Sequence, residues 1–283
     1  MIRKLAVNLF DQEVLLDHVV EIDQKRPLDL DRNIYRIFRP QHLIAMFETG
    51  ENVLISPSKW DDPYENLLLR SEMKLPKGEK AKWAKRDIYA QCWMKTSDSD
   101  AMWRIYSHDT FAIRARTTAR KLIESVIKSR SQEWAHLEAY IGGVDYKNTK
   151  DFERWATSFF AAPAAPTSRD LAETLLVKRW AFQHEKEVRV VLLPAHNNAT
   201  ESELHRYKVD PRLLVDHIMV DSRAPREVFE MYKMVFVDRL KFAGTFTRSK
   251  LYDAPSLGSI PFGHNGTPRR DMFGSKVGNI HRA

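Results

Sequence analysis

The chain has 283 residues, of which 43% are hydrophobic, so it is long enough to bury one large core or two small ones. No run approaches the roughly 20 consecutive apolar residues of a membrane span, and the N-terminal apolar pattern is interrupted too early for a signal peptide. The single cysteine, Cys92, excludes an intrachain disulfide and any multi-cysteine zinc site. These features predict a globular, cytoplasmic protein with no membrane partner.

The charge balance, 45 basic against 38 acidic residues with a net charge of +7, favours a polyanionic partner such as a nucleic acid. Two segments are richest in Lys and Arg: residues 74–86 and residues 248–283. Either segment can equally be a solvated loop, which is the commoner fate of a run of like charges.

The first half of the chain predicts short strands that alternate with helices. Residues 1–23 have a helix-like apolar pattern that can also contain a short strand. A turn is expected at 58–66, where Asp and Ser precede Pro63. The expected strands are 33–40, 52–58, 87–95 and 110–115, and the expected helices are 41–50, stopped by Gly50, then 101–107 and 117–129.

The second half predicts further helices at 151–160, 170–181 and 225–240, with strands at 187–194, 204–209, 216–222 and 241–247. A Gly-Gly break is expected at residues 142–143. The absence of a regular strand-helix-strand rhythm favours an α+β fold with mixed, mainly antiparallel sheets and flanking helices. We expect one catalytic domain at 1–247 and a basic, Gly-rich extension at 248–283.

Several common catalytic signatures are missing. The sequence contains no phosphate-binding Walker loop, no dinucleotide GxGxxG after a strand and no GxSxG elbow. The segment HEKEV at His184 begins like a zinc-protease motif, but Val188 stands where the second histidine is required. A metal-dependent nuclease using Asp61, Asp62, Glu185 and Glu187 stays open as an alternative, as does a non-catalytic nucleic-acid or nucleotide sensor.

Polar and aromatic residues gather on or beside apolar strands in four places. They are YRIFR at 35–39, WDDPYE at 60–65, the segment from CW at 92–93 to AMWRIYS at 101–107, and KRWAFQHEKEVRV at 178–190. Together with HIMVDSRAP and RSKLYD they resemble the domain-of-unknown-function family numbered 2971, over residues 34–253. That family is often met in bacterial defence settings. Trp60 and Asp61 depart from its usual Phe-Asn, and the glycine that commonly follows the tyrosine of the middle motif is absent.

The opening YRIF…HLI…G also looks like the first strand and helix of DarT-type and other ADP-ribosyltransferases. This resemblance implies an ADP-ribosyltransferase-like fold that uses NAD and no metal. Such enzymes have a His or Arg on the first strand, an aromatic ring that stacks on nicotinamide and a Glu that starts a late strand. Arg36, Tyr106 and Glu187 occupy these places in order.

The chemistry of these side chains fits the roles. A guanidinium forms bidentate bonds to phosphate or ribose oxygens and stays charged at any working pH. Cleavage of the N-glycosidic bond develops oxocarbenium character on the ribose, which a carboxylate bonded to the 2-hydroxyl stabilises. Glu185, two residues before Glu187 and on the same face if the segment is extended, is a candidate to orient or deprotonate the acceptor.

The predicted site has three parts. The expected catalytic residues are Glu187, Glu185 and Tyr106; the expected NAD-binding residues are Arg36, Tyr35, Ser56, Trp103 and Tyr106; and the expected acceptor-binding residues are Trp60, Asp61, Asp62, Arg104 and Arg189. Structural roles stay open for each: Arg36 can pair with the acidic turn, Glu187 and Arg189 can form a ladder ion pair, and Trp93, Trp103 and Trp180 can be core.

The sequence therefore predicts an ADP-ribosyltransferase acting on nucleic acid, as a toxin or anti-phage effector. Single-stranded RNA is the favoured acceptor, since exposed bases would stack on a basic rim that contains Trp83, Tyr89 and Phe262. A toxin of this kind implies a neutralising antitoxin protein.

Overall fold

The structure is a computed structural model that describes residues 15–22, 27–62, 64–65, 72–74, 80–82, 88–108, 111–129, 137–161, 166–194 and 202–254. The chain divides into two units, Met1–Tyr252 and Asp253–Ala283, and the fold below belongs to the first. Among the described residues, no helix has the length and apolar character that a membrane crossing requires.

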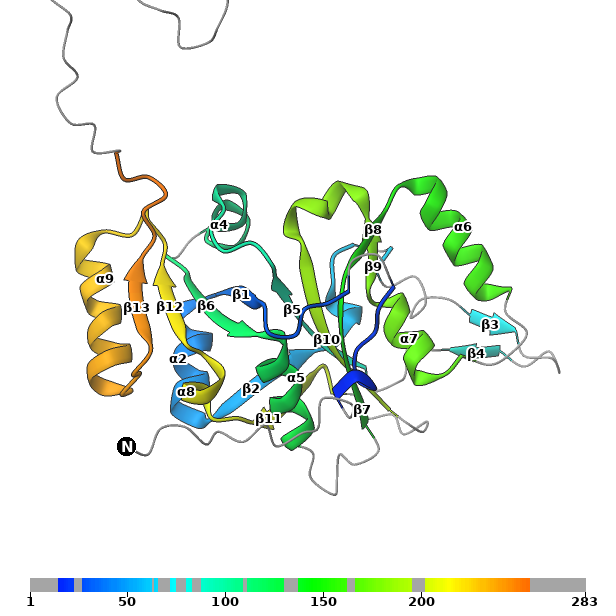
Figure 1. The fold of residues 1–283 in the computed structure, drawn as a ribbon, viewed down its shortest axis with the longest axis horizontal. Coiled ribbons are helices and arrows are strands. Elements are labelled where there is room, and N and C mark those ends of the chain that lie inside the picture. The colour runs from blue at the N-terminus through cyan, green and yellow to red at the C-terminus, as the bar shows by residue number, and fades with distance from the viewer. Residues whose placement is uncertain are drawn as a thin grey trace, which may run out of the picture. The chain divides into compact units, whose positions relative to one another are not determined.

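Nine strands form the main sheet within the described part of the chain (Figure 1). Seven follow in the order β11-β2-β5-β1-β6-β12-β13, and β10 pairs with both β5 and β7. All of these pairs are antiparallel except β12 with β13. The strands are β1 (Asn33–Phe38), β2 (Glu51–Ile55), β5 (Tyr89–Met94), β6 (Ile113–Thr118), β7 (Leu137–Gly143), β10 (Glu187–Pro194), β11 (Leu204–Lys208), β12 (His217–Val220) and β13 (Thr245–Arg248).

Two smaller sheets and a set of helices complete the unit. The small sheets pair β3 (Glu72–Lys74) with β4 (Lys80–Lys82), and β8 (Asp145–Lys147) with β9 (Val177–Arg179). The helices are α2 (Pro40–Thr49), α4 (Asp100–Tyr106), α5 (Ala119–Lys128), α6 (Thr149–Phe160), α7 (Ser168–Thr174), α8 (Pro211–Leu214) and α9 (Arg226–Lys233), with short turns of helix η1 (Pro57–Lys59), η4 (Trp180–Glu185) and η5 (Met234–Arg239).

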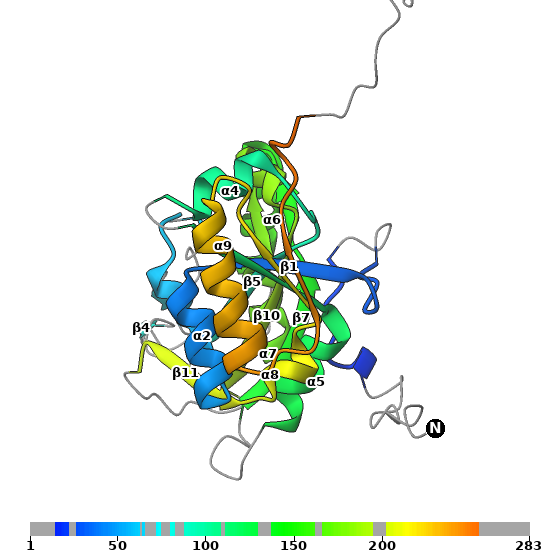
Figure 2. The same cartoon turned by 90° about the vertical axis from the view of Figure 1, so that its left-hand side faces the viewer.

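The helices cover the sheet through apolar faces. Helix α5 buries Leu122, Ile123 and Val126, at the spacing of one helical stripe, and Thr118 caps its first turn. Helices α2 and α9 lie side by side in Figure 2, and the Phe47 ring of α2 meets Phe236, just beyond α9, edge-on at 5.5 Å. Burial of these apolar faces stabilises the packing of the helices on the sheet.

One edge of β5 is shared by two strands that diverge. On this edge β2 pairs with β5 at Ala90, and β1 pairs with it at Met94. Cys92 lies between these two points, and its carbonyl accepts a hydrogen bond from Arg36 Nη1 at 3.3 Å. The opening between β1 and β2 thus brings a guanidinium to the middle of the sheet.

The α+β class with a mainly antiparallel sheet and flanking helices is confirmed, and so are most of the predicted elements. The helix predicted at 170–181 is wrong in its second half, because the chain turns at Leu175 and Leu176 and then forms β9 and η4. The predicted Gly-Gly break falls just after the glycines, since β7 ends at Gly143 and β8 begins at Asp145. Gly142 lies inside β7. A Cβ there would lie 2.5 Å from Leu176 Cδ1, so this glycine permits close packing rather than a turn.

Candidate active site

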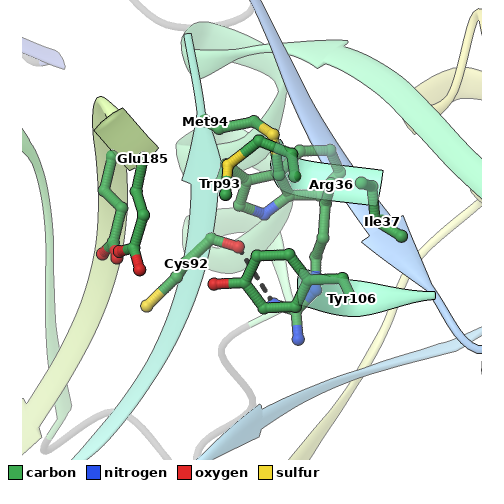
Figure 3. A pocket seen from close by; sticks show the side chains of 9 residues that line it. Arg36, Ile37, Cys92, Trp93, Met94, Tyr106 and Glu185 are labelled. Carbon is green, nitrogen blue, oxygen red and sulfur yellow. Dashed lines mark hydrogen bonds between the residues drawn. The ribbon is translucent and has the colours of Figure 1, made fainter. Parts of the chain in front are cut away.

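Three distant segments of the chain line one small cavity of about 130 Å³. Arg36 comes from β1, Tyr106 from the last residue of α4 and Glu187 from the first residue of β10. Figure 3 shows Tyr106 and Glu185 on opposite sides of Cys92. The remaining lining residues are Ile37, Cys92, Trp93, Met94, Met102 and Glu185.

Glu185 and Glu187 reach the same cation by a route that the sequence did not predict. Glu185 ends η4 and Lys186 has a φ of 46°, so the segment is not extended. The two carboxyl groups nevertheless converge on Lys178 of β9, whose Nζ lies 2.5 Å from Glu185 Oε2 and 2.8 Å from Glu187 Oε1. All three residues are buried.

Arg189 and Glu65 extend this ion cluster into the protein. The Arg189 guanidinium is 1% exposed and donates to Glu187 Oε2 at 2.5 Å, to the Leu175 carbonyl at 2.7 Å and to Glu65. Glu65 also lies 3.2 Å from Lys178 Nζ. The buried cluster therefore comprises Glu65, Lys178, Glu185, Glu187 and Arg189.

The ion cluster drives the pKa values of its two cavity-facing carboxyls apart. Burial alone would raise the pKa of Glu187, but Arg189 and Lys178 outweigh it and hold this pKa well below its usual value. Burial and a hydrogen bond to Glu187 raise the pKa of Glu185 to about 8. Near neutral pH, Glu187 is therefore ionised while Glu185 carries a proton.

The other cavity residues keep their ordinary charge states at neutral pH. Burial raises the pKa of the Cys92 thiol to about 12, so it is not a thiolate nucleophile. Partial burial and the nearby charges of Glu185 and Glu187 raise the pKa of Tyr106, which stays a neutral phenol. Burial lowers the pKa of Arg36, and Glu187 and Tyr106 oppose this shift, so Arg36 stays a cation.

A larger groove of about 800 Å³ adjoins the same carboxylate, since Glu187 lines both spaces. The Trp180 ring is 54% exposed on the wall of this groove. Arg32, Lys95 and Lys186 also line it, together with the carboxylates of Glu21, Asp145 and Glu187. The groove therefore offers a flat ring and three cations beside Glu187, with an equal number of acidic residues.

Several predicted NAD-binding residues lie away from the cavity. Tyr35 stacks on the Arg114 guanidinium, whose Cζ is 4.6 Å from its ring centre. Ser56 caps η1 by accepting a bond from the Ser58 backbone. Trp103 is 1% exposed, and its Nε1 donates to Asp98 at 2.6 Å, so it belongs to the core. Trp103 therefore presents no exposed ring face to a nicotinamide.

The predicted acceptor-binding residues are mostly structural. Asp62 receives two bonds from Arg179, at 2.9 and 3.2 Å, and Arg189 is buried in the ion cluster, 4.4 Å from the centre of the Trp60 ring. Arg104 pairs with Asp100 at 2.9 Å on the surface. Asp61 is exposed.

The structural roles that the sequence left open for Arg36, Glu187 and the tryptophans can be compared with their contacts in the structure. The acidic turn pairs with Arg179, Arg189 and Lys178, so Arg36 is not its partner. Glu187 and Arg189 do form an ion pair, and Trp93 and Trp103 are core, but Trp180 is exposed. Of the proposed basic rim, Tyr89 is 1% exposed and buried in the core, and Trp83 and Phe262 lie outside the described residues.

Lys178 is the residue that sequence reasoning missed, because a lysine beside an arginine is usually on the surface. The available signal was the number of carboxylates, since buried acids need buried cations. Of the four carboxylates in the nuclease alternative, Asp62 pairs with Arg179, and Glu185 and Glu187 pair with Lys178, whereas Asp61 is exposed. Within the described residues no group of three His, Cys, Asp or Glu side chains is arranged to hold a metal ion.

No family model matches the chain, so its resemblance to family 2971 stays a prediction. No curated protein matches it either. Among solved structures, the chain is similar to DarT of Thermus sp. 2.9 in complex with NAD+, with 13% identity, coverage of 79% of this chain and 98% of that one, and a TM-score of 0.33. The chain is also similar to the same DarT in complex with ADP-ribosylated ssDNA. Here the identity is 10%, the match covers 80% of this chain and 97% of that one, and the TM-score is 0.35.

Proposed function

We propose that this protein is an NAD-dependent ADP-ribosyltransferase that modifies nucleic acid, with RNA as the favoured acceptor, and that residues 1–247 are its catalytic domain. The proposal depends chiefly on one observation. Arg36, Tyr106 and an ionised Glu187, 70 and 81 residues apart in sequence, line one cavity. Each supplies a chemistry that cleavage of NAD requires.

NAD would enter with its nicotinamide ring against Tyr106 and its phosphate or ribose oxygens toward Arg36. The ring of Tyr106 is 44% exposed and so offers a face for stacking. The cavity has room for one small ring rather than a whole dinucleotide, so the rest of NAD would lie outside it.

Glu187 would stabilise the transition state. As the bond between the ribose carbon and the nicotinamide nitrogen breaks, the bonding electrons leave with neutral nicotinamide and positive charge develops on the ribose. Glu187 is buried and held by Lys178 and Arg189, so its charge is fixed in place before the reaction. Its bond to the 2-hydroxyl would strengthen as that charge grows.

The acceptor would approach through the groove beside Glu187. A nucleophilic nitrogen or oxygen of a base would form the new bond to the ribose carbon, and its proton would pass to the carboxylate form of Glu185. The exposed Trp180 ring suits a base, and Arg32, Lys95 and Lys186 suit phosphates. Single strands present unstacked bases at low cost, which favours RNA over a DNA duplex.

The biological setting follows from this chemistry and from the resemblance to family 2971. Covalent modification of nucleic acid would interfere with its function in the cell, so we propose a role as a toxin or anti-phage effector. A toxin of this kind requires a neutralising antitoxin protein. The basic segment 248–283 would add to the attraction for nucleic acid.

The test uses radiolabelled NAD with purified RNA, single-stranded DNA, duplex DNA or protein lysate, with EDTA present. We expect label on RNA first, and none with Glu187→Gln. The matched control is Glu48→Gln, whose exposed carboxylate pairs with Arg239 and does not line the cavity. Label on DNA but not RNA would overturn the choice of acceptor. Nicotinamide release without label would indicate an NAD hydrolase, and no turnover of NAD would overturn the proposal.

A further inference from the structure

The buried ion cluster has an excess of acid over base. It holds three carboxyl groups, from Glu65, Glu185 and Glu187, but two cations, Lys178 and Arg189. The exposed fractions of these side chains are 9% or less. A buried charge without a partner is costly, so either a proton or a ligand must balance the third carboxyl.

The geometry places that proton on Glu185. Glu185 Oε2 and Glu187 Oε1 lie 2.5 and 2.8 Å from the same Lys178 Nζ, so two buried carboxyl groups share one cation at close range. Like charges placed in this way favour protonation of one of the two groups. Glu187 is bound by both Lys178 and Arg189, whereas Glu185 has Lys178 as its cation. Two cations stabilise the charge of Glu187 more than one stabilises that of Glu185. The raised pKa of Glu185 agrees with this assignment.

The groups that face Glu185 come from five elements. Lys178 of β9 and Glu187 of β10 contact it, and the phenols of Tyr106 and Tyr146, from α4 and β8, also sense its charge. Cys92 of β5 lies between Glu185 and Tyr106 (Figure 3). Both phenols and the thiol are neutral near pH 7 because their pKa values are raised.

Arg36 is the remaining charge on the cavity wall. Its guanidinium bonds to the Cys92 carbonyl rather than to a member of the cluster. In the proposed complex it faces the phosphate or ribose oxygens of NAD, so it is not available to balance Glu185.

We propose that the positively charged nicotinamide ring of NAD+ supplies the missing charge when it enters this cavity, and that Glu185 then releases its proton to solvent. This inference depends on the proposed function. Protonated Glu185 and NAD+ go to ionised Glu185 with bound NAD+ and one free proton, so charge and atoms balance. The two substrates would therefore act in a fixed order. Glu185 becomes a base only after NAD+ has bound, and it is then ready to accept a proton from the nucleic-acid acceptor.

The experiment is isothermal titration calorimetry of the full chain at about pH 7 with carba-NAD+, an analogue that keeps the cationic ring. Each titration is run in phosphate and in Tris, because the buffer takes up a released proton and its enthalpy of protonation, which differs between the two buffers, adds to the measured heat. We expect close to one proton released per analogue bound, falling toward zero at about pH 9.5, where Glu185 is already ionised.

Two controls separate this mechanism from other proton release. NADH has a neutral ring on the same framework, so we expect it to bind without releasing a proton. Glu185→Gln replaces a neutral acid with a neutral amide of the same shape, and we expect it to bind carba-NAD+ with no release. Glu48→Gln should release the same proton as the unchanged chain.

Each outcome decides a separate point. Binding of carba-NAD+ with equal heats in both buffers would overturn the proton release and leave the proposed function standing. Equal release with NADH, or release that persists in Glu185→Gln, would show that the ring charge or Glu185 is not its source. If carba-NAD+ does not bind at all, the proposed function fails and this inference fails with it.

Discussion

Lys178 Nζ lies 2.8 Å from Glu187 Oε1, and both side chains are 7% exposed. The chain turn in η4 separates the two residues, yet it folds β9 back beside the start of β10. Lys178 also contacts Glu185 and Glu65, so one cation serves three carboxyl groups. The ionised state of Glu187 therefore depends on a residue that does not line the cavity.

Removal of this cation should destabilise the fold strongly. Lys178→Met leaves three buried carboxyls with Arg189 alone, and breaking a buried ion pair costs roughly 3–5 kcal/mol. Urea unfolding followed by circular dichroism measures the loss. In the control, Arg154→Met, an exposed pair with Asp151 is removed, which costs less than about 1 kcal/mol. If Lys178→Met lost no more unfolding free energy than the control, the buried ion cluster would not depend on Lys178.

The pH dependence of stability should report the proton on Glu185. The folded state raises the pKa of Glu185 from 4.5 to about 8, so between these values the folded chain binds a proton that the unfolded chain lacks. At low pH Glu185 is protonated in both states, so its titration contributes nothing to the free energy of unfolding. As pH rises toward 8, the unfolded chain loses this proton first, so wild-type stability falls. Glu185→Gln cannot titrate, so its advantage over wild type should grow from about pH 5 to pH 8 and then level off. If the difference in unfolding free energy between Glu185→Gln and wild type stayed constant from about pH 5 to pH 8, Glu185 would not hold the proton.

Tyr106 should act through its ring and not through its hydroxyl. A stacked aromatic pair contributes about 0.5–1.5 kcal/mol, so Tyr106→Ala should raise the KM for NAD roughly 2- to 10-fold. Tyr106→Phe keeps the ring and should change KM less than about twofold. Phe111 is 38% exposed and does not line the cavity, so Phe111→Ala should leave KM unchanged. Equal losses for the Phe and Ala variants at position 106 would assign the role to the hydroxyl instead.

Periodicity predicted most of the fold, because β1, α2, α5 and β10 carry clear alternating or helical apolar patterns and end at signals such as Gly50. It failed at 175–185, where buried Leu175, Leu176 and Val177 resemble the interior of a helix. The turn there depends on parallel pairing of β9 with β8, a contact between distant segments that no local pattern encodes.

The sequence predicted which types of residue the candidate site contains, but not which individual residues line the cavity. Arg36, Tyr106 and Glu187 carry chemistry that is visible in the sequence, and the structure brings them together. In the sequence, Trp103 is as plausible a stacking residue as Tyr106, but in the structure its ring is buried and its Nε1 donates to Asp98. Which face of a strand or helix a side chain occupies, and which acids share Lys178, depend on tertiary packing.

Arg36 should contribute through the shape of its guanidinium as well as its charge. Hydrogen bonds to charged groups contribute about 1.5–3 kcal/mol, so Arg36→Met should raise the KM for NAD roughly 10- to 150-fold. Arg36→Lys keeps the charge but loses the fork of donors, and should fall between wild type and Arg36→Met. The control is Arg39→Met, an exposed arginine at the end of β1. A fully active Arg36→Lys would reduce the role of Arg36 to a point charge.

Trp180 should affect the acceptor and not the donor. Stacking of a base on an aromatic side chain contributes about 1–3 kcal/mol, so Trp180→Ala should lower transfer of label to RNA roughly 5- to 150-fold, while Trp180→Phe should retain much of it. Release of nicotinamide in the absence of RNA should stay the same in both variants, because Trp180 lines the groove and not the cavity. The measurement is the ratio of label on RNA to nicotinamide released. If Trp180→Ala lowered both rates equally, Trp180 would act on NAD or on the position of η4, and the groove would lose its assignment as the acceptor path.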